Sequence, residues 1–142
     1  NRWPASFRNQ WPASSEYAFF LADIHACEKQ HHWIWYIFPQ NKGLGHSAMS
    51  QEYSIEGLEE ATVYWKHDLL RSRYLEALGL VSGLSVEPRV FFGSLDLMKF
   101  RSSLTLFELA SEKNPAIVAF IEQRLSGERD EVTLAMLKEQ TT

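Results

Sequence analysis

The sequence predicts a mainly α-helical protein: a single compact helical domain of about six helices, with at most one or two short strands. The 142 residues suffice for one ordinary domain and are too few for two. Hydrophobic residues make up 45% and charged residues 23%, which are values of globular chains rather than disordered ones. Most segments between glycines and prolines carry apolar side chains at helical spacing.

The first 14 residues are expected to form an extended lead-in, and residues 15–142 the helical domain. The tetrapeptide Trp-Pro-Ala-Ser stands at 3–6 and again at 11–14, and its prolines disfavour a helix. Ser14 or Ser15 can then cap a helix that runs to about Lys29, with apolar positions at Tyr17, Phe20, Leu21, Ile24 and Cys27.

Residues 31–40 read HHWIWYIFPQ, a run rich in aromatic and β-branched side chains that ends at a proline. On propensity this run predicts a strand, and a buried helical segment stays open as the alternative. Residues 41–47 are expected to be a loop, because Gly43 and Gly45 permit backbone angles that other residues resist. Ser47 can cap a short helix to about Tyr53.

Further helices are expected over 56–65 and 68–80, with Gly83 and Pro88 breaking the chain afterwards. A short apolar stretch follows at 90–93. Three more helices have recognisable starts: Ser94 can cap one over 95–109, Asn114 with Pro115 begins one that runs to about 125, and Asp130 can cap the last through 137.

Composition also excludes some partners. The formal net charge is −4, so the basic stripe typical of nucleic-acid binding is missing and such binding is disfavoured. No stretch approaches the roughly 20 apolar residues of a membrane span, and no membrane partner is expected. The single cysteine, Cys27, is typical of a reducing compartment and predicts a cytoplasmic location. Cofactor and oligomeric state are left undetermined.

Two ungapped motifs carry a family resemblance: HWIWYIFPQNKGLGHS at 32–47 and FGSLDLMKFRSSLTLF at 92–107. Together with shorter matches over about 17–137 they resemble domain-of-unknown-function family 1810. Asp68 and Arg71 depart from the family pattern, which usually has Pro and Gly there. The resemblance implies a helical fold without an established activity. The layout is also loosely similar to the NADAR type, a helical group tied to NAD and ADP-ribose chemistry, which implies a nucleotide-like ligand.

The first candidate site is the aromatic motif with its glycine-rich loop. A Trp ring can stack on a planar base or sugar, and glycine lets the backbone approach a ligand closely. The expected ligand-binding residues are His32, Trp33, Trp35, Gln40, Gly43, Gly45, Ser47 and Tyr53. A buried aromatic segment followed by a turn explains the same pattern and stays open. No metal site is expected, because His31 and His32 have no partners at ligand spacing.

The second candidate site is the group Lys99, Arg101 and Ser102. A Lys with hydroxyls can hold a phosphate or carboxylate, and Arg can clamp it with two hydrogen bonds. Helical spacing places Lys99 and Ser102 on one side and Arg101 on another. A solvated basic face, or a buried group paired with an acid, is the structural alternative.

Glu60 and Asp130 are the candidate catalytic carboxylates, because cleavage at an N-glycosidic bond needs a carboxylate beside an oxocarbenium-like centre. Asp130 is equally explained as a helix cap. The leading hypothesis is a domain that binds a small anionic or nucleotide-like molecule, with ADP-ribose-like ligands and N-glycosidic hydrolysis or transfer as its specific form. The alternative is a noncatalytic protein-interaction module that uses an aromatic surface.

Overall fold

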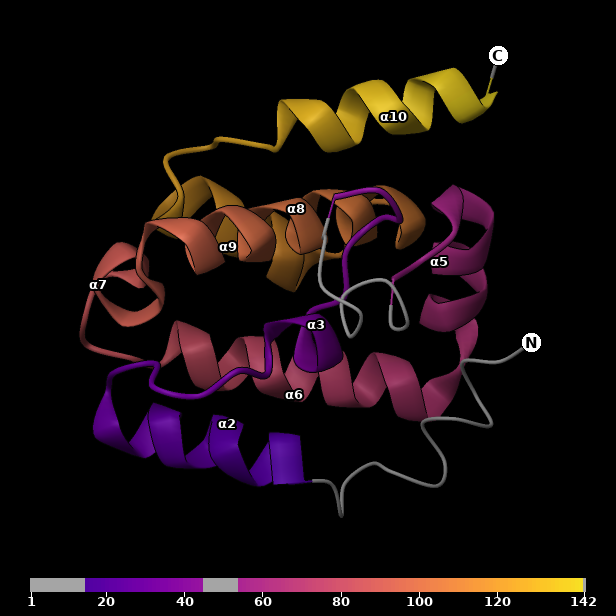
Figure 1. Ribbon diagram of the computed structural model, residues 1–142. Helices are drawn as coiled ribbons and strands as arrows, with labels where there is room; N and C mark the ends of the chain where they lie inside the picture. Colours follow the sequence, from indigo (N-terminus) through magenta and orange to yellow (C-terminus); the bar gives the residue numbers. More distant parts are fainter. Residues whose placement is uncertain (1–14, 45–53, 142) are drawn as a thin grey trace.

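The computed structural model describes residues 15–44 and 54–141 (Figure 1). Its eight helices within those residues are α2 (Ser15–Ala26), α3 (Ile34–Ile37), α5 (Gly57–Lys66), α6 (Asp68–Ser82), α7 (Pro88–Phe92), α8 (Ser94–Ala110), α9 (Pro115–Arg124) and α10 (Glu131–Thr141). The predicted fold class is confirmed. The short helix α7 is additional to the segments expected to be helical. The helix expected over 47–53 lies outside the described residues.

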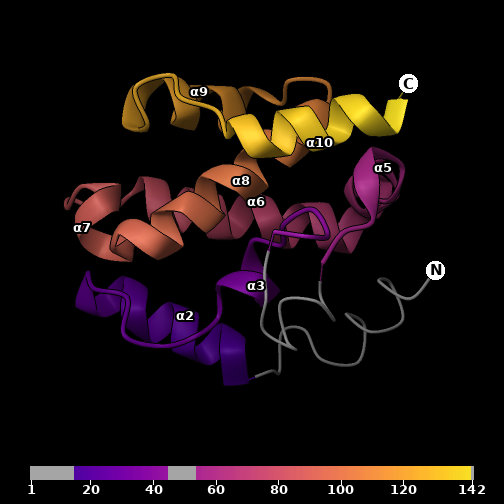
Figure 2. The same cartoon turned by 45° about the horizontal axis from the view of Figure 1, so that its top comes forward.

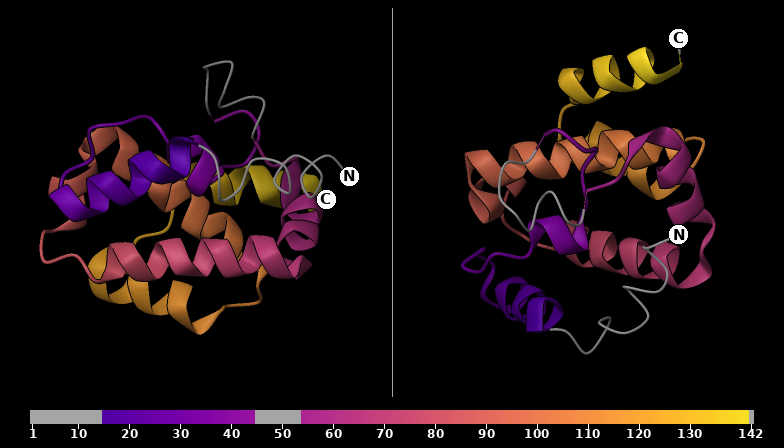
Figure 3. Two further views of the ribbon diagram at one scale, coloured as in Figure 1. Left: turned by 90° about the horizontal axis from the view of Figure 1, so that it is seen from below. Right: turned by 45° about the vertical axis from the view of Figure 1, so that its right-hand side comes forward.

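Helix α8 is the centre of the fold, in contact with α3, α5, α7, α9 and α10. Helix α2 lies at one end of the stack and α10 at the other, with α6 and α8 between them (Figures 1 and 2). Helix α5 runs across one end of α6 and α8, and α7 lies at the opposite end (Figure 3). No helix in the described part of the chain is both long and apolar enough to cross a membrane.

Every residue from Ser102 to Glu108 in α8 is buried, because neighbours surround the helix. Its polar side chains are accommodated by internal hydrogen bonds. The Ser103 hydroxyl lies 2.9 Å from the Tyr74 hydroxyl, and Thr105 donates to the Arg101 carbonyl oxygen at 2.8 Å. Burial of these hydroxyls is therefore compatible with stability, since each has a partner.

The strand predicted over 31–40 is wrong, and the alternative left open, a buried helical segment, describes Ile34–Ile37. Residues Ile34–Ile37 form one helical turn in which Ile34, Tyr36 and Ile37 are buried. A strand needs a neighbour for its backbone groups, and the described residues contain one isolated parallel bridge, between Asn41 and Ile55. Packing on every side of the segment therefore outweighs its β propensity.

Helix ends follow capping chemistry where the side chains allow it. The Asn114 side chain accepts a hydrogen bond from the Ala116 N–H at 2.9 Å, which confirms this predicted start. Asp130 Oδ2 accepts from the Thr133 N–H at 2.9 Å, which confirms the last helix start. The cap predicted at Ser94 is wrong, because Gly93 with φ +79° is the N-cap and Ser94 is the first helical residue.

The first helix ends at Ala26, three residues earlier than predicted. Cys27 has a φ of +58°, a left-handed conformation that terminates an α-helix. The loop that follows is held by the Asp23 carboxylate, which accepts hydrogen bonds from the backbone N–H groups of Gln30 and His31. Asp23, which lies within α2, thus fixes the backbone of the loop that follows this helix.

Candidate functional site

Trp33, the centre of the first predicted motif, lies in the core with no exposed surface. Its ring contacts Phe20 and Phe92, with centroids 4.8 and 6.1 Å away. Its indole N–H donates to Asp23 Oδ2 at 2.8 Å, and the Lys29 amine lies 4.7 Å from its ring centroid. The structural alternative noted for this motif therefore describes Trp33, whose ring and N–H both have intramolecular partners.

Asp23 is a residue that the sequence reasoning missed. Its side chain is 1% exposed and Oδ1 lies 2.7 Å from His31 Nδ1. Burial alone would raise the pKa of Asp23, but hydrogen bonds from Trp33, His31 and the Gln30 N–H outweigh burial and lower it. A lone Asp on a predicted helix gives no signal, since its partners come from the following loop.

The other residues of the first motif are spread over several environments. Trp35 is half-buried and packs edge-on against Tyr36, with centroids 5.8 Å apart, while His32 is exposed. Gln40 is half-buried, and its backbone oxygen accepts from the Ile55 N–H. Gly43 is exposed with φ +101°, and an added Cβ would lie 3.3 Å from Met136 Cε. Gly45, Ser47 and Tyr53 lie outside the described residues.

The second predicted motif divides between two faces of α8. Lys99 Nζ lies 3.7 Å from Asp96, and the Ser102 hydroxyl lies 2.9 Å from that of Thr133. Arg101 Nη2 is 4.0 Å from Glu128 Oε1 on the other side. The structure therefore does not bring Lys99, Ser102 and Arg101 together around one point, as the helical spacing indicated.

Arg101 instead lines a cavity of about 250 Å³ between α7, α8, α9 and the turn after α9. Its polar lining residues are Glu87, Arg89, Arg101, Arg124, Ser126 and Glu128. Pro88, Leu97 and Leu125 supply apolar walls. Three arginine residues therefore line one small cavity, although the whole chain has a net charge of −4.

The three arginines differ in how firmly they are held. Arg124 donates to the carbonyl oxygens of Ser82 and Val86, both at 3.0 Å, so its guanidinium is fixed. Arg101 Nε is buried and has no hydrogen-bond partner in the described structure. Arg89 is exposed at the start of α7. The cavity lining thus combines one arginine held by backbone carbonyls, one with an unpaired and buried Nε, and one that is exposed.

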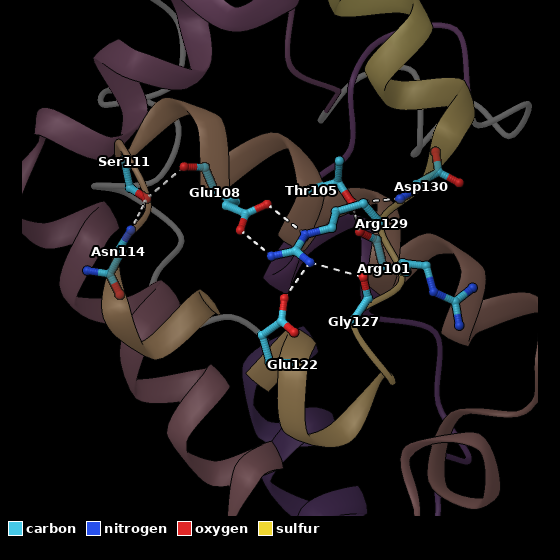
Figure 4. Close-up of polar contacts among 9 residues, drawn as sticks. All are labelled: Arg101, Thr105, Glu108, Ser111, Asn114, Glu122, Gly127, Arg129 and Asp130. Carbon is cyan, nitrogen blue, oxygen red and sulfur yellow. Dashed lines mark hydrogen bonds and ion pairs between the residues drawn. The ribbon is translucent and has the colours of Figure 1, made fainter. Parts of the chain in front are cut away.

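Arg129 supports the turn that carries Glu128. Figure 4 shows its guanidinium between two carboxylates, with Arg101 extending away from them. Arg129 Nε and Nη2 donate to Glu108 at 3.1 and 2.7 Å, and Nη1 donates to Glu122 at 2.6 Å. These hydrogen bonds, Glu108 first, raise the pKa of Arg129 further above its ordinary value. Arg129 was not predicted, because its partners lie on α8 and α9.

Both candidate catalytic carboxylates take part in local capping. Asp130 Oδ2 accepts from the Thr133 hydroxyl at 2.6 Å, and the Asp130 N–H donates to Thr105 Oγ1 at 2.9 Å (Figure 4). Glu60 Oε1 accepts from the Glu56 N–H at 3.1 Å, at the start of α5. Neither residue is among the described residues that line the arginine cavity.

A larger cavity, of about 680 Å³, lies along α5. Its described lining consists of α5 residues and the residue before that helix, with Lys66 as its one described cation. No three His, Cys, Asp or Glu side chains within 15–44 and 54–141 are placed to hold a metal ion. Of the two cavities, the arginine cavity is the one that contains a predicted ligand-binding residue.

Comparisons with known proteins confirm the predicted family. The family model described as "Protein of unknown function (DUF1810)" matches residues 7–137. The crystal structure of the conserved hypothetical protein Rv1873 from Mycobacterium tuberculosis is similar, with 38% identity and a TM-score of 0.80 over 86% of this chain and 88% of that one. A search of curated proteins found no match. These comparisons do not show the looser similarity to NADAR-type proteins.

Proposed function

We propose that this protein, which belongs to the DUF1810 family of proteins of unknown function, binds a small molecule through an anionic, phosphate-like group in the arginine cavity. The observation that carries the proposal is the convergence of Arg89, Arg101 and Arg124 on about 250 Å³. Arginine is the side chain best suited to such a group, because its planar fork donates two parallel hydrogen bonds to phosphate or carboxylate oxygens.

The state of Arg101 supports a bound anion. A buried donor without a partner costs about 1–3 kcal/mol, and the cost is larger when the donor is charged. Arg101 Nε is such a donor, and the nearest carboxylate, Glu128, is 68% exposed and lies 4.0 Å from Nη2. An anion in the cavity would give the Arg101 guanidinium a closer acceptor than Glu128 at Nη2, and a shift of the side chain would let it reach Nε as well.

Binding is the part of the predicted function that the geometry supports best. N-glycosidic cleavage needs a carboxylate beside the ligand, and Glu60 and Asp130 both accept hydrogen bonds at helix starts. A nucleotide-like ligand is compatible with the cavity through its phosphate. Loss of turnover in Asp130→Asn or Glu60→Gln, with binding retained, would extend the proposal to catalysis.

The alternative of an aromatic interaction surface has less support. Of the described tryptophans, Trp33 and Trp65 are at most 8% exposed and Trp35 is half-buried. A hot-spot surface needs aromatic rings that a partner can reach. Partner binding would therefore have to depend on other side chains of the described residues.

Calorimetric titration with inorganic phosphate, pyrophosphate and nucleotides tests the proposal. Arg101→Ala should weaken binding at least about tenfold, because charge-assisted hydrogen bonds contribute roughly 1.5–3 kcal/mol. Its melting temperature should stay near that of the wild type. Arg71→Ala is the matched control, because Arg71 pairs with the exposed Asp68 on α6. Lys99→Ala should also bind normally, since Lys99 is directed to Asp96.

Two results would contradict the proposal. The first is equal weakening in Arg71→Ala and Arg101→Ala, which would indicate a nonspecific charge effect. The second is the absence of binding by the wild type at millimolar concentrations of all three ligand classes. A ligand bound only by the native state must also raise the melting temperature with concentration, which provides an independent readout.

A further inference from the structure

We infer that the ligand of the arginine cavity is a phosphate ester with hydroxyl groups beside its phosphate, such as a sugar phosphate. Glu128 would accept hydrogen bonds from those hydroxyls. This inference rests on the proposed function. The observation behind it is the mixed charge of the lining. Two carboxylates, Glu87 and Glu128, share the cavity with three guanidinium groups. In a site for a bare anion, these carboxylates would repel the ligand and weaken its binding.

The carboxylates constrain the ligand chemically. An ionised carboxylate only accepts hydrogen bonds, so it repels a phosphate and needs a donor opposite it. Glu128 already competes for the cation that the phosphate would use, since its Oε1 lies 4.0 Å from Arg101 Nη2. A ligand with hydroxyl groups next to its phosphate supplies both an acceptor for Arg101 and donors for Glu128. Its phosphate replaces Glu128 at Arg101, and its hydroxyls donate to the displaced carboxylate.

The backbone around Glu128 is held in place, although its side chain is 68% exposed and able to rotate. Ser126 and Gly127 have φ values of +56° and +73°, and the Glu128 N–H donates to the Leu125 carbonyl oxygen at 3.0 Å. The Arg129 clamp to Glu108 and Glu122 fixes the next residue. This turn therefore keeps a carboxylate in the cavity lining, where its contact with Arg101 is long and its side chain is largely exposed.

The cavity size agrees with this ligand class. About 250 Å³ is below the range of drug-sized sites, so it suits a phosphate with a small adjoining group. The Ser126 hydroxyl, which can both donate and accept, adds a neutral partner for a sugar hydroxyl in the same lining.

Paired calorimetric titrations test the inference. Ribose 5-phosphate is compared with cyclopentylmethyl phosphate, which has a five-membered ring and a phosphate but no hydroxyls. The wild type should prefer the sugar phosphate by about tenfold, the effect of one hydrogen bond to a charged group. Glu128→Gln should reduce this preference and bind inorganic phosphate more tightly, because the competing charge is removed. Glu59→Gln, an exposed change on α5, is the control.

The failures of the two proposals are distinguishable. Equal affinity of the wild type for the two esters, or an unchanged preference in Glu128→Gln, overturns hydroxyl recognition; if Arg101→Ala still abolishes binding of both esters, the phosphate site stands. Absence of binding of either ester by the wild type overturns both proposals. Circular dichroism of Glu128→Gln shows whether the variant is folded. If it is not, Glu128→Ser supplies the same comparison with a small polar side chain.

Discussion

Replacing Asp23 with alanine should destabilise the protein strongly. The Asp23 carboxylate is 1% exposed and accepts from the N–H groups of Gln30, His31 and the Trp33 indole at 2.9, 3.0 and 2.8 Å, with His31 Nδ1 2.7 Å from Oδ1. Alanine would leave the fully buried indole N–H without an acceptor. Loss of an acceptor for a buried donor costs about 1–3 kcal/mol, and three N–H donors lose theirs here, so a total of about 3–5 kcal/mol is expected.

Urea and thermal denaturation of the two proteins measure this effect. A loss of about 3–5 kcal/mol is a large share of the 5–15 kcal/mol typical of a domain, and corresponds to a fall in Tm on the order of 10 °C. Asp68→Ala is the control, with an expected loss of about 0.5 kcal/mol, because Asp68 is 92% exposed. A change below about 1 kcal/mol in Asp23→Ala would refute the idea that this carboxylate holds the loop after α2 and the Trp33 ring.

The same carboxylate predicts a pH dependence. The pKa of Asp23 in the folded protein lies below the ordinary value of an aspartate, because hydrogen bonds stabilise its charged form. A lowered pKa means that Asp23 stabilises the folded state above the unfolded value, and that this contribution is lost as pH falls from about 4 through the folded pKa. Asp23→Asn should therefore show a flatter stability curve than the wild type between about pH 5 and pH 2. Identical curves would contradict the assignment.

Three further predictions concern the turn, the loop and the central helix. Arg129→Ala should lower the free energy of unfolding by about 2–4 kcal/mol, because the half-buried guanidinium donates hydrogen bonds to Glu108, which is 9% exposed. In chemical denaturation, Arg129→Lys should lose less stability than Arg129→Ala, because the ammonium keeps the charge. Gly43→Ala should lower the free energy of unfolding by about 1–2 kcal/mol in the same assay, because a φ of +101° is strained for a residue with a Cβ. An unchanged free energy of unfolding would show that the loop adopts another backbone conformation. Ser102→Ala should cost about 1 kcal/mol by removing one of the two hydrogen bonds of the Thr133 hydroxyl, which still donates to Asp130. A loss of phosphate binding with full stability would instead place Ser102 in the ligand site.

Local chemistry accounts for the part of the fold that was predictable. Asn114 and Asp130 cap helices because each side-chain oxygen reaches an N–H two or three residues ahead, which depends on nothing outside the segment. The segment at 34–37 was predicted as a strand because its residues favour strands by type. Its actual conformation depends on the core that encloses it, and the sequence pattern contains no record of that core.

The candidate site divides in the same way. Arg101 was predicted because an Arg in a motif with hydroxyls and a lysine can clamp an anion. Helical spacing also predicted that it lies on another side of the helix from Lys99. Arg89 and Arg124 were not predicted, since they come from α7 and α9 and meet Arg101 only in the folded chain. For Trp33 the motif indicated a ligand contact. In the folded chain its N–H donates to Asp23 and its ring lies beside the Lys29 amine.

The sequence by itself determined the helical class, the family and the residues that begin several helices, because these depend on composition, ordered motifs and contacts within a few residues. The tertiary structure decided which polar side chains have partners and which face a cavity. The carboxylates of Asp23 and Glu108 are satisfied by groups brought from other segments, while Arg101 Nε is not. Which distant side chains become partners depends on packing, and this is what distinguishes the fully paired Arg129 from Arg101.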